Sequence, residues 1–97
     1  AGYLQQLKIE SEIDKAEDRD AEITEKRNET IEYIKGILES IKNSKSEIEV
    51  NGFAKVALRY LEARKKIAAV ADICEAGLKN VAIEGQKRKE AIKNEVA

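Results

Sequence analysis

The sequence predicts an all-α protein: an antiparallel hairpin of two long helices that dimerises into a four-helix bundle or an elongated coiled coil. Three observations lead to this prediction. Charged residues make up 38% of the 97-residue chain, which contains no proline. Apolar residues recur at helical spacing over two long stretches. A short run of turn-forming residues separates the stretches, so that two helices in a single domain would lie antiparallel.

The first helix is predicted over about residues 3–43. Its seam alternates steps of three and four residues, as in a coiled coil, if Asp20 and Arg27 are counted as members. The other members are Ile9, Ile13, Ala16, Ile23, Thr30, Ile34, Ile37 and Ile41. Asp20, Arg27 and Thr30 therefore form a polar section of the seam. These side chains either extend to solvent at the edge of the helix interface, or they determine the register of the helices or the choice of partner.

A connector is predicted over about residues 44–51. It begins in the run Asn43-Ser44-Lys45-Ser46, whose short polar side chains compete for backbone hydrogen bonds and so favour a turn. Ile48 and Val50 are expected to close the end of the core. Asn51 is the predicted N-cap of the helix that follows.

The second helix is predicted over about residues 52–95, and its most apolar part runs from Phe53 to Ile83. One broad apolar stripe follows this part, and a thinner stripe on the opposite side contains Leu58, Ala69, Ala76 and Ile83. A helix that is apolar on two sides packs between partners, which predicts an oligomer. Gly77 and Gly85 indicate either close packing of the backbone or a break near Gly85 that makes a short third helix.

The strongest members of these stripes are the candidates for the core and the oligomer interface. They are Ile34, Ile37, Ile41, Val56, Tyr60, Ile67, Val70, Ile73, Cys74 and Val81. The expected partners are a second copy of the chain and an unidentified protein.

Two basic clusters support an alternative interpretation, in which a hairpin dimer binds RNA or DNA. One cluster contains Arg59, Arg64, Lys65 and Lys66, and the other contains Lys87, Arg88, Lys89 and Lys93. Positioned lysines and arginines are sufficient for phosphate contacts. The net charge of −1 and the lack of interleaved aromatic residues argue against this function, so we rank it second.

The sequence does not favour an enzyme, a cofactor or a metal site. The chain has no histidine, the commonest general base, and Cys74 lies on the main apolar stripe, where a buried inert thiol is expected. The acids of the first helix lack the Asp-x-Asp-x-Asp-Gly form of a calcium loop, and no phosphate-binding or zinc spacing occurs. A solvated acidic helix face is the simpler interpretation.

The expected location is the cytoplasm, because a single cysteine excludes an intrachain disulfide and fits a reducing compartment. No apolar run approaches the ~20 residues that span a bilayer, so no transmembrane segment is predicted.

Short segments of the chain resemble small coiled-coil accessory proteins encoded by tailed phages. The similar residues are Leu38–Ile41, Glu47–Val56 and Leu61–Ala63, which cover less than a third of the chain and require a gap. We assign no family on this basis, but the resemblance implies a phage or mobile-element origin. The predicted function is a helical protein–protein interaction module: a small adaptor, chaperone, scaffold or inhibitor.

Overall fold

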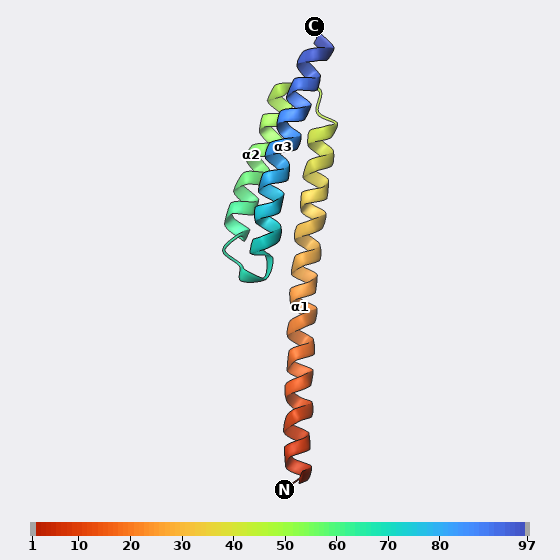
Figure 1. The fold of residues 1–97 in the computed structure, drawn as a ribbon, viewed down its shortest axis with the longest axis vertical. Helices are drawn as coiled ribbons and strands as arrows, with labels where there is room; N and C mark the ends of the chain where they lie inside the picture. The colour runs from red at the N-terminus through yellow and green to blue at the C-terminus, as the bar shows by residue number, and fades with distance from the viewer. Residues whose placement is uncertain (1, 97) are drawn as a thin grey trace.

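The computed structural model describes the backbone of residues 2–96 and the side chains of residues 20–95. Over this backbone the chain forms three α-helices, α1 (Gly2–Lys42), α2 (Glu47–Arg64) and α3 (Ala71–Val96), with a 3-10 turn, η1 (Ala68–Val70), before α3. The predicted all-α class is confirmed. In Figure 1, α2 and α3 lie beside only the C-terminal half of α1, and the molecule is 79 Å long.

Helix α1 has nearly the predicted bounds, and its C-terminal half carries the predicted seam into the core. Ile34 and Ile41 are buried there, and Ile37 packs against the same core. The side chains of Ile9, Ile13 and Ala16 lie outside the described residues.

Helix α2 begins earlier than predicted, because the N-cap is Ser46 and not Asn51. Ser46 is extended, with φ −141° and ψ 158°, and its side chain accepts a 3.2 Å hydrogen bond from the Glu49 backbone amide. The Glu49 carboxylate accepts a 2.7 Å bond from the Lys45 amide. This Ser-x-x-Glu sequence resembles a capping box, a helix-start signal stronger than Asn51.

Only one of the two apolar residues assigned to the connector closes the core. Val50 is fully buried, whereas Ile48, two residues after the cap, is 84% exposed. Both residues belong to α2 and not to a connector, which is limited to the four residues between Lys42 and Glu47.

The prediction of one uninterrupted helix over residues 52–95 is wrong. The chain leaves the helix after Arg64, and Ile67 is extended, with φ −85° and ψ 114°. Hydrogen bonds from the Ile67 amide to the Arg64 carbonyl (3.0 Å) and from the Val70 amide to the Ile67 carbonyl (3.1 Å) hold the reversal. Helix α3 therefore runs back along α2.

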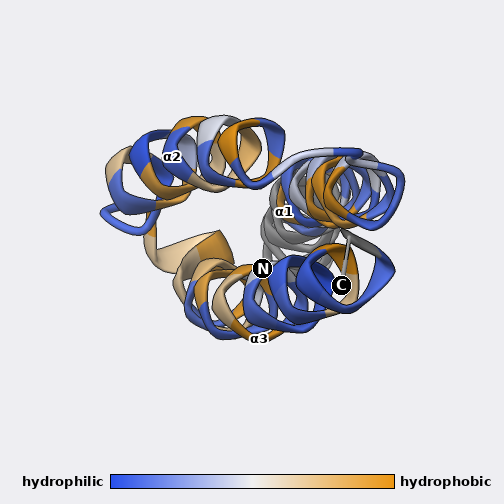
Figure 2. Cartoon of the chain, turned by 90° about the horizontal axis from the view of Figure 1, so that it is seen from above, coloured by the Kyte–Doolittle hydropathy of each residue, from blue (hydrophilic) through white to orange (hydrophobic). Residues whose placement is uncertain are grey.

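The reversal allows both parts of the predicted second helix to pack against α1. Viewed along the long axis, the three helices form a triangle (Figure 2). Two clusters fill its interior: Ile41, Val50, Ala57, Val81 and Ile92 form one, and Ile34, Leu61, Val70 and Cys74 form the other. Each cluster takes residues from α1, α2 and the α3 region, so burial of apolar area by a third helix compensates for the interrupted helix.

Of the two alternatives for the glycines, the break near Gly85 does not occur, since α3 continues to Val96. Gly77 instead marks close packing of α3 on α1. A Cβ atom built at Gly77 would lie 2.5 Å from Ile34 Cδ1, 2.9 Å from Ile34 Cγ1 and 3.2 Å from Leu61 Cδ1. At Gly85 it would meet only Val50 Cγ1, at an ordinary 3.7 Å.

The two glycines are predicted to respond oppositely to alanine. Gly85→Ala should raise the free energy of unfolding by up to about 1 kcal/mol, because alanine favours helix and the site has room. Gly77→Ala should lower it by about 1–2 kcal/mol, because displacement of Ile34 outweighs the same helix gain. Urea denaturation followed by circular dichroism measures both.

Ile34→Val supplies the matched control for this prediction, because valine lacks the Cδ1 atom that a new Cβ would strike. Gly77→Ala should therefore cost less in the Ile34→Val background. Equal stabilisation by Gly77→Ala and Gly85→Ala would contradict the close packing.

Candidate interaction surfaces

Arg27, in the middle of α1, binds the turn between α2 and α3. Its Nη1 atom donates a 2.9 Å hydrogen bond to the Ala69 carbonyl, and the guanidinium bonds to both carboxylate oxygens of Asp72 at 2.9 and 3.1 Å. The planar fork of arginine suits this bidentate pairing. Arg27 thus anchors the first turn of α3.

A second arginine strengthens the same junction from α2. Arg64 Nε donates a 2.8 Å hydrogen bond to Thr30 Oγ1, and Nη2 lies 3.3 Å from Glu29 Oε2. Thr30 is fully buried and donates its own hydroxyl proton to the Lys26 carbonyl at 2.9 Å. The polar section of the seam therefore fixes register within the chain at Arg27 and Thr30, whereas Asp20 is exposed.

Hydrogen bonding at this junction changes the acidity of its charged groups. The bond from Arg27 holds the pKa of the Asp72 carboxyl below its ordinary value, and the same bond raises the pKa of Arg27. Asp72 is 66% exposed, so the pair orients the turn more than it stabilises the fold.

The two basic clusters lie at opposite ends of the bundle. Arg64 bonds to Thr30 at the reversal, whereas Arg88 donates a 2.7 Å hydrogen bond to the Ser44 carbonyl at the α1–α2 connection. Arg88 also pairs with Glu95, Lys65 with Glu75, and Lys87 with Glu84. Arg59 and Lys66 are exposed, and Lys89 is partly buried.

The candidates for the core and interface fall into two groups. Most pack within the chain: Ile34, Ile41, Val70, Cys74 and Val81 are buried, and Ile37, Tyr60 and Ile73 pack against these clusters. Val56 and Ile67 are 57% and 38% exposed and stay interface candidates. This division was not predicted from the sequence, because the reversal that separates α2 from α3 was not predicted.

Cys74 and Tyr33 carry groups that can react, but both pack in or against a core cluster. Cys74 is fully buried beside Leu61 and Val70, and burial raises the pKa of its thiol. Tyr33 stacks on Tyr60 with ring centroids 3.7 Å apart, and burial raises the pKa of its phenol. Both shifts favour the neutral form at physiological pH, so neither group is an activated nucleophile.

The N-terminal part of α1 extends past the reversal as a single helix, which we name the arm (residues 2–26). Arg27 is the first α1 residue within residues 20–95 that bonds to another element. Within the described backbone, neither α2 nor α3 runs beside the arm (Figure 1). At 1.5 Å per residue the arm is about 38 Å long.

Several apolar side chains on the bundle surface are also exposed to solvent. Over the described side chains, Ile48, Val56, Leu58 and Ile83 are each more than half exposed. Leu58 lies in a groove between α2 and α3 that is lined by Ala54, Lys55, Leu58, Leu78, Val81 and Ala82, which we name the outer groove. The arm and the outer groove are the principal candidate interaction surfaces.

Comparison with protein-family models, curated proteins and solved structures found no match to this chain. Among the described residues, no helix has both the length and the apolar character needed to cross a membrane.

Asp72→Asn is predicted to make thermal stability less dependent on pH. Because the pKa of Asp72 is lowered by folding, its carboxylate stabilises the fold above the unfolded pKa of about 3.9, and this contribution is lost as pH falls through the folded pKa. The variant should melt below the wild type at pH 7, and the two melting temperatures should converge toward pH 3.

Glu62→Gln is the matched control, since it removes one negative charge from an exposed position of α2. It should leave the pH dependence close to that of the wild type. A melting-temperature difference for Asp72→Asn that persists unchanged at pH 3 would show that the ion pair is not its cause.

Proposed function

We propose that this chain is a non-enzymatic helical protein–protein interaction module, a small adaptor, chaperone, scaffold or inhibitor that works as an oligomeric bundle. The observation that carries the proposal is the arm, which continues α1 beyond the end of α2 and α3 (Figure 1). An isolated helix in water is only marginally stable, and most helices in proteins depend on packing of an apolar face. The arm is therefore expected to bind a partner.

The arm carries the sequence pattern of a packing helix. Its residues Ile9, Ile13, Ala16 and Ile23 continue the three-and-four spacing that Ile34 and Ile41 follow into the core. Ile23, whose side chain is described, is 41% exposed. A seam that is buried in one half of a helix and uncovered in the other supports binding by a second helix.

Self-association is the simplest source of that second helix. The exposed side chains of Val56, Leu58 and Ile67 add apolar area that a second copy of the chain would remove from water. A homodimer is the proposed state, and a further protein would bind to the assembled bundle. We also propose a cytoplasmic location, for which the single cysteine, buried as a free thiol, is the support.

Nucleic-acid binding ranks below protein binding. Five of the eight residues in the two basic clusters already bond to carboxylates or other polar groups of the chain: Arg64, Lys65, Lys87, Arg88 and Lys93. A salt-dependent shift of labelled RNA or DNA that Arg59→Glu and Lys66→Glu abolish would reverse this ranking.

Light scattering after size exclusion, over a concentration series, tests the proposed self-association. Wild type should be a dimer at high concentration, whereas Ile13→Asp should weaken association on the order of 100-fold, because an unpaired charge would enter the seam. Ser11→Asp, two residues away and off the stripe, is the matched control and should stay dimeric.

Most of the helical circular dichroism signal should survive in both variants, because residues 20–26 of the arm make no hydrogen bond or ion pair to α2 or α3 and the bundle begins at Arg27. Wild type that stays monomeric at every concentration would contradict self-association. Equal association of wild type and Ile13→Asp would instead contradict the role of the arm.

A further inference from the structure

The outer groove has the character of an unoccupied helix-packing site. It encloses about 240 Å³, and all six of its lining residues come from α2 and α3. Five of them are apolar, and Leu58 is 52% exposed at its rim. In Figure 2, α1 lies at one corner of the triangle, so it covers α2 and α3 only from one side. A fourth helix could pack against their other side.

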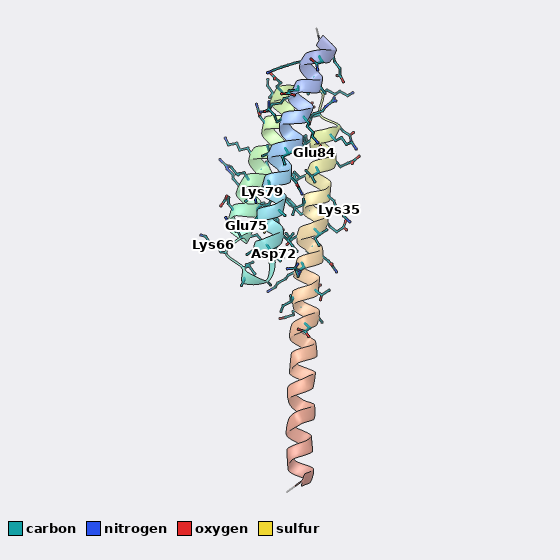
Figure 3. The ribbon with its side chains drawn as sticks, in the orientation of Figure 1. Lys35, Lys66, Asp72, Glu75, Lys79 and Glu84 are labelled. Carbon is teal, nitrogen blue, oxygen red and sulfur yellow. The ribbon has the colours of Figure 1, made fainter. Side chains whose placement is uncertain are left out.

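Exposed basic residues flank the groove. Lys55 lines it directly, Arg59 lies one helical turn further along α2, and Lys79 follows Leu78 on α3, on the side turned away from α1 (Figure 3). None of the three pairs with a carboxylate among residues 20–95. Glu75, one turn before Lys79, already pairs with Lys65 at 3.6 Å. The groove therefore favours an acidic helix.

The arm has the complementary charge. Residues 2–26 contain eight acidic residues and four basic residues, a net charge of −4. Their apolar stripe would face the groove, and their acids would lie near its basic rim. The arm is also long enough, since its ~38 Å exceeds the ~27 Å of the 18-residue helix α2.

The groove between α1 and α3 is less suitable for an acidic helix. Its lining balances Glu39 and Glu84 against Lys35 and Lys42, and Lys35 already pairs with Glu32 at 3.6 Å. In Figure 3, Lys35 and Glu84 lie on this side of the molecule and Lys79 lies on the other. Charge thus distinguishes two grooves that are both partly apolar.

The arm cannot reach the outer groove of its own chain. Helix α1 is continuous from Gly2 to Lys42, and the arm points away from the bundle (Figure 1). Over the described residues, no loop interrupts α1 to let the arm fold back. An arm that fills the groove must therefore belong to another molecule.

We propose that the arm of one copy packs into the outer groove of a second copy, and that the second copy returns its arm in the same way. The inference rests on the proposed self-association and adds its geometry. Because arm and groove are different surfaces, docking in one direction would build an open chain, whereas reciprocal docking closes a two-fold dimer. Each bundle then contains four helices, three of its own and one from the partner.

Disulfide trapping between two full-length variants tests this geometry. Both carry Cys74→Ala to remove the native thiol, and one carries Leu58→Cys in the groove. The other carries a single arm cysteine, Ile9→Cys, Ile13→Cys or Ala16→Cys, so that the unknown register is sampled. Mild oxidation of a mixture should give a mixed disulfide with at least one arm position, at several times the yield of the control.

Gly36→Cys is the matched control for the arm cysteines, because it lies on α1 with no atom within 4 Å of its Cβ position. A second variant keeps the test independent of the trapped pair. Lys55→Glu with Lys79→Glu should weaken association by up to about tenfold at low salt and much less at high salt. Circular dichroism confirms that each variant is folded.

The outcomes separate this inference from the proposed function. Arm cysteines that link only to each other would overturn arm-in-groove docking and leave self-association standing. A dimer that forms no mixed disulfide at any arm position would do the same. Monomers by light scattering, without any cross-link, would overturn both proposals.

Discussion

The reversal between Arg64 and Val70 determines how much of α1 the rest of the chain can cover. A straight second helix would have matched α1 along its whole length and left no arm. Because the chain turns back there, α2 and α3 both pack against the C-terminal half of α1, and neither runs beside the described backbone of the other half (Figure 1). The contacts that hold the turn against α1 are polar and join residues far apart in the sequence: Arg27 with Ala69 and Asp72, and Arg64 with Thr30.

This arrangement divides one helix into two parts with different surroundings. From Thr30 onward, α1 contributes buried residues to both core clusters, and Gly77 lets α3 approach Ile34 closely. Before Arg27 the described side chains are exposed. The chain therefore offers a half-helix that neither α2 nor α3 flanks over the described backbone and, on the far side of α2 and α3, an apolar groove with basic edges. In the proposed dimer, each arm packs into the outer groove of the other copy, so that the same contact buries the arm and the groove.

Much of the fold could be predicted from residue spacing alone. Period and composition were sufficient for the all-α class, for α1 and for the burial of Ile34, Ile41 and Val70. The reversal was missed because Lys65 and Lys66 are good helix formers and neither proline nor glycine marks the turn. The sequence contains only a weak sign of the reversal. Arg64 interrupts the apolar stripe of the predicted second helix, and Thr30, to which Arg64 bonds, lies in the polar section of the first helix's seam. Such pairing over 34 residues is visible only in three dimensions. The start of α2, however, could have been predicted, because Ser46 and Glu49 have the spacing of a capping box.

In the proposed dimer, the arm depends on another molecule for its stability, whereas the bundle does not. Hydrogen exchange of full-length protein, measured across a dilution series that spans the dimer dissociation constant, tests it most directly. Amides of the arm should be protected at high concentration and exchange rapidly after dilution, whereas buried amides of residues 30–92 should stay protected throughout. Arm protection that does not change with concentration would contradict the account, since the arm would then be stable without a partner.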